Sequence, residues 1–230
     1  TVIKDAANRY FLSFVVEIEP VQVEAKNQSI GIDLGIKTFA AMSNGEMVKS
    51  PDYSKLDKRL RRKQKQLARQ ESGSKRREKT RLQIAKLHNE IADTRKDFLH
   101  KLSTRVVNEN QVITLEDLNV SGMVRNRRLS RAISMQGWRE FRVLVEAKSE
   151  KLGRKFVVIS RWEPTSQICS DCGYKWGKLD LSIRSVLCLS CGSEHDRDEN
   201  AAKNINQVGI GHGHDSKRTR IDRKTTFVAS

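Results

Sequence analysis

The 230-residue sequence is poor in cysteine, has no long apolar run and carries fewer acidic than basic residues. Its only four cysteines lie in one short segment as two C-x-x-C pairs, which argues against a disulfide framework and for a metal in a reducing compartment. No apolar run approaches the roughly 20 residues that cross a bilayer, and no signal peptide is visible. We therefore expect a cytoplasmic protein with no membrane partner.

Basic residues dominate the charge of the chain. Lysine and arginine number 44 against 28 aspartates and glutamates, which gives a net charge of +16. This charge predicts a polyanionic partner, and nucleic acid is favoured over a membrane surface. The length allows one large domain or two small ones. The chain begins at Thr1, partway into a predicted strand, so we expect a fragment of a longer protein.

One candidate acid lies in the stretch Ser29–Asn44, SIGIDLGIKTFAAMSN. Apolar residues alternate here with glycine and aspartate, which is the period of a strand with one apolar face. Gly31 and Gly35 flank Asp33 closely and would leave room for a metal ion or a phosphate near the backbone. An ordinary strand and turn explains the same residues. Asp33 therefore becomes a site only if other carboxylates lie beside it.

The strands predicted near this stretch are short. Residues 9–19, RYFLSFVVEIE, form one strand, and residues 21–28 form a polar connection. Residues 38–42 and 46–49 form a hairpin whose turn is Asn44-Gly45.

A more apolar strand is predicted for residues 111–118, QVITLEDL. Its almost continuous apolarity indicates burial on both faces of a sheet. Glu116 and Asp117 follow each other, so they point to opposite faces, and at most one can face Asp33. Further on, residues 121–136 are predicted as a loop, 137–152 as an amphipathic helix that Gly153 ends, and 155–160 as a strand.

Residues 55–105 contain 18 of the lysines and arginines but only six acids. Leucine and isoleucine recur at helical spacing, and Ser72-Gly73-Ser74 interrupts the pattern, which predicts two long basic helices joined at Gly73. Two helices whose charged side chains simply face water, with no bound partner, would explain the same pattern. Because such helices repel themselves, we favour a bound polyanion. The candidate nucleic-acid contacts are Arg61, Arg62, Lys75, Arg76 and Arg77.

The cysteines predict a zinc ribbon over residues 166–195. Cys169 and Cys172 form one C-x-x-C knuckle and Cys188 and Cys191 the other, and a glycine follows each knuckle. Four thiolates fill a tetrahedral site and leave no open position, so this zinc is predicted to be structural. His195 is expected to be a polar neighbour rather than a ligand.

A helix is predicted to start near Asp196–Asp198 in the sequence HDRDENAAKNI. Acids in a first helical turn are commonly caps and dipole partners. The order of segments adds a second interpretation. GIDLGIKTFA, then LEDLNV, then two C-x-x-C pairs followed by DRDENAAKNI resemble TnpB, the family of transposon-encoded RNA-guided nucleases related to type V CRISPR effectors. The resemblance covers roughly residues 9–206.

The resemblance implies an α/β fold: an RNase H-like (RuvC) mixed sheet with flanking helices, a long basic helical hairpin insertion and a zinc-ribbon insertion. It implies catalytic and magnesium-binding roles for Asp33, Glu116 and Asp198, with Asp33 bridging two Mg²⁺ ions. The implied segments are a remnant of the N-terminal wedge domain (1–26), the RuvC-like core (27–165) with its basic segment (55–105), the zinc ribbon (166–195), the final motif helix (196–207) and a basic flexible tail (208–230).

The function implied is that of an RNA-guided DNA endonuclease of a transposon, Mg²⁺-dependent, prokaryotic and nucleoid-associated. Its partners would be guide RNA, target DNA and the wedge and recognition part of the same protein, of which only the last strand is expected here. Two alternatives remain: a guided DNA-binding protein that does not cleave, and a RuvC-like recombination nuclease. The implied activity is that of the parent protein, and the sequence leaves open whether the 230-residue chain cuts DNA alone.

Overall fold

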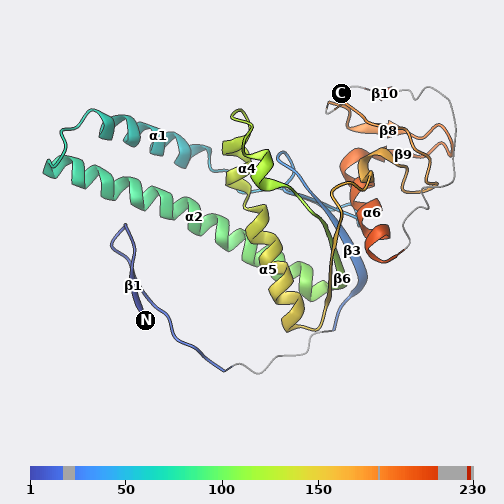
Figure 1. The fold of residues 1–230 in the computed structure, drawn as a ribbon, viewed down its shortest axis with the longest axis horizontal. Helices are drawn as coiled ribbons and strands as arrows, with labels where there is room; N and C mark the ends of the chain where they lie inside the picture. Colours follow the sequence, from blue (N-terminus) through green and yellow to red (C-terminus); the bar gives the residue numbers. More distant parts are fainter. Residues whose placement is uncertain (18–23, 181, 212–226, 229–230) are drawn as a thin grey trace. The chain divides into compact units, whose positions relative to one another are not determined.

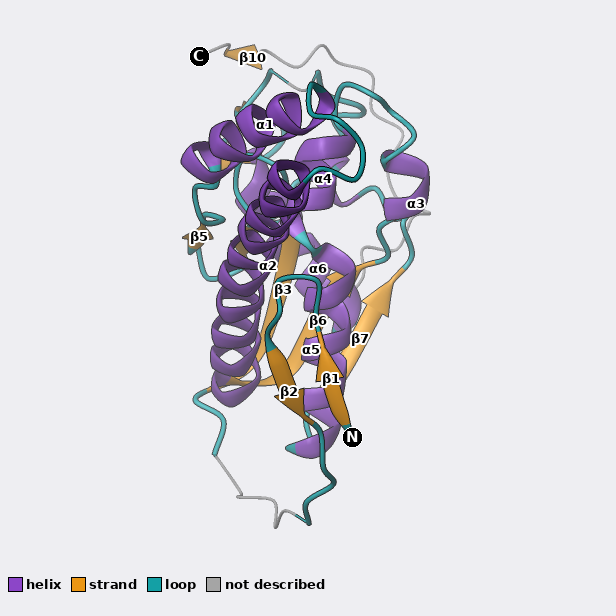
Figure 2. Cartoon of the chain, turned by 90° about the vertical axis from the view of Figure 1, so that its left-hand side faces the viewer, coloured by secondary structure: helices purple, strands orange, loops and turns teal. Residues whose placement is uncertain are grey.

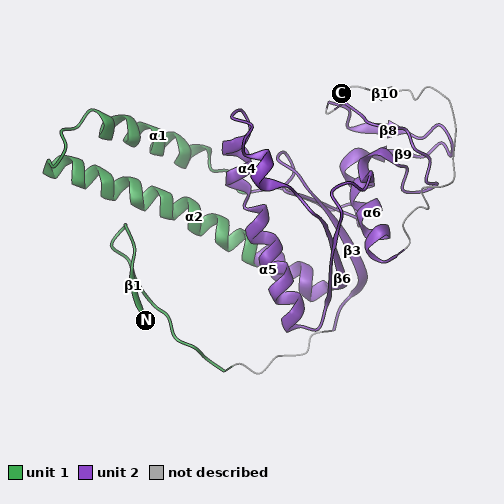
Figure 3. Ribbon diagram, in the orientation of Figure 1, with its two compact units in different colours: residues 1–20, 51–100 green, residues 21–50, 101–230 purple. Residues whose placement is uncertain are grey.

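The computed structural model describes residues 1–17, 24–180, 182–211 and 227–228 (Figure 1). The chain divides into two compact units, which Figure 3 distinguishes by colour. The first comprises residues 1–20 and 51–100, and the second comprises residues 21–50 and 101–230. No helix in the described part of the chain is long and apolar enough to cross a membrane.

The first unit begins with a small hairpin of strands β1 (Val2–Lys4) and β2 (Tyr10–Leu12). The strand predicted over residues 9–19 was therefore too long. Only residues 10–12 pair, residues 13–17 form no strand, and residues 18 and 19 lie outside the described part. The aromatic and β-branched residues that predicted a strand find only a three-residue partner in β1, and Phe14 and Val15 lie beyond this pairing. The side chains of β2 and of Phe14 and Val15 are all exposed.

Helices α1 (Ser54–Ala68) and α2 (Lys75–Glu109) confirm the two predicted basic helices. Gly73 lies between them with φ of 80°, a conformation that glycine adopts without strain. The Arg77 guanidinium donates to the carbonyl oxygens of Leu67 and Gln70 at 2.8 and 3.0 Å. These carbonyls lie at the end of α1, where a helix has no internal donors left. Arg77 thus stabilises the connection between the helices.

The second unit is built on a five-stranded mixed sheet of order β5-β4-β3-β6-β7 (Figure 2). Strands β3 (Asn27–Leu34), β6 (Asn110–Glu116) and β7 (Lys155–Ile159) run parallel. Strands β4 (Ala40–Met42) and β5 (Met47–Val48) are antiparallel, and Gly45 with φ of 88° lies at their turn as predicted. The α/β class is confirmed. Strand β3 begins at Asn27, inside the predicted polar connection.

The centre of this sheet is apolar on both faces. Ile113, Thr114 and Leu115 are consecutive residues of β6 and all are buried, which confirms the strand predicted from continuous apolarity. Helix α5 (Trp138–Lys151) lies on one side of the sheet and helix α6 (Arg197–Gly209) on the other (Figure 1). The predicted amphipathic helix is thus confirmed, and Gly153, with φ of 63°, follows its end.

The loop predicted for residues 121–136 was wrong, because two short helices form there. Helix α3 covers Val120–Met123, and the Asn119 side chain caps it by accepting from the Gly122 amide at 3.0 Å. Helix α4 covers Ser130–Gln136 and buries Ile133. The segment is mostly basic and polar, so its sequence shows no apolar helical face. The buried Ile133 contacts residues from other parts of the fold, and those contacts cannot be read from the segment alone.

The cysteine-containing segment carries the 3₁₀ turn η1 (Thr165–Gln167) and strands β8 (Ser185–Leu187) and β9 (Glu194–Asp196). A third strand, β10 (Phe227–Val228), pairs with β8. The predicted flexible tail, 208–230, needs correction at both ends: residues 208 and 209 belong to α6, and residues 227 and 228 form β10. The rest of that tail beyond residue 211 lies outside the described residues.

Candidate active site and metal centre

Helix α6 lies so close to strand β3 that only glycine fits at position 31. A Cβ on Gly31 would be 2.2 Å from the Ala202 carbonyl oxygen and 2.4 Å from the Asn206 amide nitrogen. The space beside Gly31 is therefore filled by the backbone of α6, not by a ligand, which corrects the expectation of open room there. A Cβ on Gly35 would lie 2.9 Å from the Thr38 carbonyl oxygen, so that glycine serves a tight turn.

The contacts along this helix set the position of its first turn. The Asn206 side chain donates to Ser29 Oγ at 3.0 Å, and Ala202 lies against Gly31. Four residues of helix advance by about 6 Å, and two residues of strand by about 6.8 Å. Four residues back along α6 from Ala202 is Asp198, and two residues on along β3 from Gly31 is Asp33. The same register therefore brings Asp198 beside Asp33. Ser29, Gly31 and Asp33 all point to this face because side chains alternate along a strand.

Glu116 reaches the same face from the adjacent strand. Strands β3 and β6 are parallel, with Gly31 opposite Thr114 and Ile32 opposite Leu115. Thr114 points toward α6, because a Cβ on Gly209 would lie 2.0 Å from its Oγ1. Glu116 is two residues further along β6 and shares that side of the sheet. The carboxyl ends of the two strands thus place Asp33 and Glu116 together under the start of α6.

Electrostatics support this proximity. Burial raises the pKa of Asp33, the neighbouring negative charges of Asp198 and Glu116 add to the increase and Arg197 opposes it, and together these effects bring the pKa to about 7. Burial likewise raises the pKa of Glu116 to about 7, opposed by a hydrogen bond with Thr165. Carboxyls that are buried beside other carboxylates hold protons more tightly, unless a cation compensates the charge.

The third acid, Asp198, is held by an arginine from the cysteine-containing segment. Nη1 of Arg184 lies 3.3 and 3.2 Å from the two carboxylate oxygens of Asp198. The backbone carbonyl of Arg184 accepts from the Arg197 amide at 2.7 Å, which fixes the segment against the start of α6. Arg184 was not predicted from the sequence, because no residue near it in the chain indicates a partner fourteen positions away.

The two neighbouring acids, Asp196 and Asp117, have other partners. Asp196 caps α6, and its carboxylate accepts from the amides of Asp198 and Glu199 at 2.9 and 3.0 Å. Asp117 accepts from Arg142 at 2.9 Å and from Arg161, and these two arginines, with Arg161 the stronger, lower its pKa. Asp117 therefore belongs to an ion-pair cluster, whereas Glu116 faces α6.

Amide side chains on the buried face of α6 hold the chain that leads into the cysteines. Asn204 Nδ2 donates to the carbonyls of Thr165 and Ile168 at 2.7 and 2.8 Å. Asn200 donates to the Ile168 carbonyl and accepts from the Ser170 amide, both at 2.8 Å. Both asparagines are buried. Polar residues recurring at i, i+4 on an otherwise alanine-rich face were the signal that could have indicated these contacts from the sequence.

The four cysteines converge as predicted. Their Sγ atoms all lie within 4.8 Å of one another, and Cys169–Cys191 and Cys172–Cys188 are 3.8 and 3.6 Å apart. Zinc–sulfur bonds of about 2.3 Å at tetrahedral angles require sulfurs about 3.8 Å apart. The arrangement fits one zinc ion. These are also free thiols rather than disulfides, whose sulfurs are only about 2.05 Å apart.

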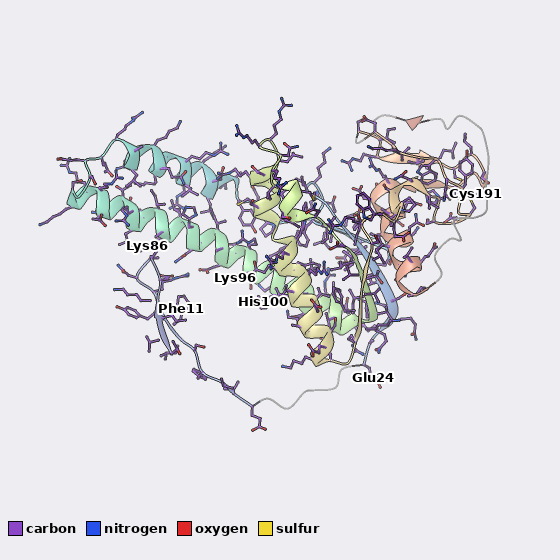
Figure 4. All side chains as sticks on the ribbon, in the orientation of Figure 1. Phe11, Glu24, Lys86, Lys96, His100 and Cys191 are labelled. Carbon is purple, nitrogen blue, oxygen red and sulfur yellow. The ribbon has the colours of Figure 1, made fainter. Side chains whose placement is uncertain are left out.

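Each C-x-x-C knuckle has one buried and one exposed thiol: Cys169 and Cys188 are buried, and Cys172 and Cys191 are exposed. Burial raises the pKa of Cys169, while hydrogen bonds with Ser193 lower the pKa of Cys191 to about 6. Cys191 is exposed, and Figure 4 labels it among the side chains of this segment. His195 Nε2 lies 3.1 Å from Cys169 Sγ, so His195 contacts a predicted ligand. Among the described residues, only these four cysteines bring three or more potential ligand atoms within 4.8 Å of one another.

The candidate nucleic-acid contacts lie in the first unit. Arg61, Arg62, Lys75 and Arg76 are exposed, although Arg61 pairs with Asp57 at 2.9 Å. Arg77 differs, since its guanidinium holds backbone carbonyls. Further along α2, Lys86 and Lys96, which Figure 4 labels, are also exposed. Their roles as phosphate contacts stay predictions.

Residues 13–127, half of the chain, match the model of the OrfB_IS605 family, which is described as a probable transposase. The chain belongs to the OrfB_IS605 family. Residues 138–205 of this OrfB_IS605 protein also match the Cas12f1-like TNB domain. The second match spans α5, β7, the cysteines and most of α6.

Two curated proteins show the sequence similarity of this OrfB_IS605 chain to nucleases. A Streptomyces pristinaespiralis protein named "Putative RNA-guided DNA endonuclease" is 43% identical over 211 residues, covering 91% of this chain and 52% of the relative. The "CRISPR-associated endodeoxyribonuclease Cas12f1" of Sulfoacidibacillus thermotolerans is 27% identical over 223 residues, covering 87% of this chain and 50% of the relative. The chain spans about half the length of the curated relatives it matches.

A solved structure shares the fold. It is described as the cryo-EM structure of the Cas12f1-sgRNA-target DNA complex, and it matches with a TM-score of 0.54 and 19% identity. The match covers 83% of this chain and 51% of that one. At this identity the likeness establishes the fold of this OrfB_IS605 chain and leaves its chemistry to be argued from its own residues.

Proposed function

We propose that this chain is the nuclease-bearing part of a transposon-encoded, RNA-guided DNA endonuclease of the TnpB type, with an RNase H-like (RuvC) site. The observation that carries the proposal is the placement of Asp33, Glu116 and Asp198. These acids come from three distant segments, yet they meet on one face of the sheet where β3 and β6 end and α6 begins. The names of the relatives support the same function.

The chemistry of these residues fits hydrolysis of a phosphodiester. Carboxylate oxygens are the ligands that Mg²⁺ prefers, and two such ions can activate a water and stabilise the leaving oxygen. Asp33 is the acid on which the charges of both other acids act, and we assign it to bridge the ions, with Glu116 and Asp198 each completing one. The carboxyls with pKa near 7 bind metal by releasing their protons.

The surrounding residues hold this site in place. Arg184 fixes the Asp198 carboxylate, and Thr165 hydrogen bonds to Glu116. Asn200 and Asn204 tie α6 to the segment that carries the cysteines. Zinc bound to those cysteines would stabilise that segment and, through it, the start of α6. Zinc has a structural role in this proposal, and magnesium a catalytic one.

The partners proposed are a guide RNA and a target DNA. The exposed basic residues of α1 and α2 would bind phosphates, which position a nucleic acid without reading its sequence. Sequence would be read by RNA–DNA pairing, the principle established for guided effectors. Residues 1–26 would be the end of a wedge domain whose remaining part belongs to the same full-length protein, and residues 55–105 and 166–195 would be insertions into the RuvC-like core.

The test uses the full-length protein loaded with RNA from its own locus. Asp33→Ala, Glu116→Ala and Asp198→Ala should each abolish Mg²⁺-dependent cleavage of a matched DNA target, while guided binding to that target persists. Asp117→Ala and Asp196→Ala are matched controls, because both remove a carboxylate next to the site. They should keep activity or lose it only in proportion to stability. An Asp198→Ala protein that cuts at the normal rate would refute the assignment.

A further inference from the structure

Each C-x-x-C knuckle carries one of its two thiols on the surface of the protein. Cys172 and Cys191 are exposed, whereas Cys169 and Cys188 are buried. All four Sγ atoms lie within 4.8 Å of one another, so the two exposed sulfurs are also neighbours. Zinc binds cysteine as the thiolate, and the thiolate is the form that reacts with oxidants. Susceptibility to oxidation follows thiolate character and exposure, and of the four cysteines only Cys172 and Cys191 would combine both.

The two buried sulfurs are fixed by their surroundings. Cys169 and Cys188 pack with Tyr174 in one apolar cluster, and Trp176 packs against it. His195 Nε2 lies 3.1 Å from Cys169 Sγ. A disulfide that used either buried sulfur would have to break this packing, whereas the exposed sulfurs can approach each other at the surface. Oxidation should therefore join the exposed pair.

We infer that Cys172 and Cys191 form an oxidative modification site, at which hydrogen peroxide converts two zinc-bound thiolates into a disulfide and releases the metal. In the first step the Cys191 thiolate attacks one peroxide oxygen and the O–O bond breaks. The hydroxide that leaves takes up a proton, which gives a sulfenic acid and water. In the second step the Cys172 thiolate attacks the Cys191 sulfur, the S–O bond breaks, and the departing hydroxide is protonated. Two thiolates, one peroxide and two protons thus give one disulfide and two water molecules.

Loss of zinc follows because the thiolate, not the disulfide, is the metal ligand. The ion would keep only the two buried thiolates, and these would no longer be held by a complete tetrahedral site. The segment that carries the cysteines has two small apolar clusters, and Trp176 packs against both. The second cluster contains Leu179, Ile183 and Val186. With so little apolar packing of its own, the segment should depend on the metal for its fold and loosen on oxidation.

Amide side chains transmit this change to helix α6. Asn200 accepts from the Ser170 amide at 2.8 Å, and Gln207 Nε2 donates to the Ser170 carbonyl at 2.9 Å. Buried amides that lose such partners are left unsatisfied, which destabilises the helix. The first turn of α6 would also lose the contact between Arg184 and Asp198. Oxidation should therefore stop DNA cleavage reversibly. This last consequence rests on the proposed function, whereas the modification site does not.

The experiment treats the zinc-loaded 230-residue chain with excess hydrogen peroxide and follows zinc release with a zinc-sensitive dye. One disulfide should form for each zinc ion released, and a dithiol with added zinc should reverse the change. Proteolysis without reduction, followed by mass spectrometry, should find peptides joined through Cys172 and Cys191. Retention of zinc in excess peroxide would overturn the inference. A disulfide through Cys169 or Cys188, or sulfinic acids in place of a disulfide, would also overturn it.

Two histidine substitutions locate the reactive thiols. Structural zinc sites accept three cysteines and one histidine, so Cys191→His and Cys188→His both keep a complete ligand set. Cys191→His removes one exposed thiolate and should retain its zinc in peroxide. Cys188→His keeps both exposed thiolates and should release zinc as fast as the unsubstituted chain. Equal sensitivity of the two variants would refute the site. If Cys188→His does not bind zinc, the disulfide map of the unsubstituted chain decides the question.

Hydrogen exchange separates the modification from its effect on the helix. In the oxidised chain, exchange should increase in α6 and stay unchanged in α2, which belongs to the first unit. An increase confined to the cysteine-containing segment would refute the coupling to α6. None of these readouts requires cleavage. A guide-loaded full-length protein that does not cut DNA would refute the proposed function alone, and one that cuts DNA but keeps its zinc in peroxide would refute the modification site alone.

Discussion

Replacing Gly31 by alanine tests the contact that brings Asp198 to the sheet. The new Cβ would lie 2.2 Å from the Ala202 carbonyl oxygen and 2.4 Å from the Asn206 amide nitrogen. Both atoms are backbone, so no change of side-chain rotamer relieves the clash and α6 itself must move by about 1 Å. The helix would withdraw Ala201, Ala202 and Ile205, which are all buried.

The magnitude follows from the cost of overpacking. Such insertions cost about 1–3 kcal/mol and occasionally more, and a clash with two backbone atoms belongs at the upper end. For a unit of this size, about 3 kcal/mol corresponds to a fall in Tm of about 6–12 °C. Since α6 carries Asp198, the full-length Gly31→Ala protein should also lose most of its cleavage activity at temperatures where it remains folded.

Thermal unfolding followed by circular dichroism, with zinc present, measures the change in Tm. Gly153→Ala is the matched control, because Gly153 has φ of 63° and nothing lies within 4 Å of an added Cβ. Its cost is backbone strain alone, about 1–2 kcal/mol, and cleavage should be unaffected. A Gly31→Ala protein with Tm within about 2 °C of the parent and full activity would show that α6 does not depend on this contact.

Three further predictions concern metal, charge and pH. Elemental analysis should find one zinc ion per chain; Cys172→Ser should release it and increase hydrogen exchange in α6, and full zinc content in this variant would refute the site. Charge reversal of exposed residues on α1 and α2 should weaken nucleic-acid binding. It should also reduce the slope of log K against log salt concentration by about 0.7–0.9 for each lost phosphate contact. An unchanged salt titration would show that these helices are solvated surfaces. The folded pKa values of Asp33 and Glu116, about 7, exceed their ordinary values of 3.8 and 4.5, so the folded state binds more protons between these limits and its stability should fall as pH rises through that window. Mg²⁺ should restore Tm at pH 8 but not at pH 5, and Asp33→Asn should remove this response; a Tm independent of pH and Mg²⁺ would contradict the site. The residues to reverse are Arg61, Arg62, Lys75 and Arg76; Arg77 is excluded because it holds the connection between α1 and α2.

Local pattern in the sequence was enough for several features. The period of two placed Asp33 on a strand, continuous apolarity placed β6 inside the sheet, and the C-x-x-C spacing brought four sulfurs together. The turn at Gly73 and the start of a helix near Asp196–Asp198 were also predicted. In each case the residues that define the feature are neighbours along the chain, so their spacing alone carries the geometry.

Tertiary structure decided what local pattern could not. The glycine at position 31 indicated open space in the sequence, but the space is occupied by a helix that begins more than 160 residues later. The partner of Asp198 is Arg184, and the amides that orient α6 are those of Asn200 and Asn204, all through contacts that arise only on folding. The strand predicted over residues 9–19 was too long for the same physical reason. A strand needs a neighbouring strand to accept and donate its backbone hydrogen bonds. The sequence of one strand does not determine the length over which such a neighbour will pair with it.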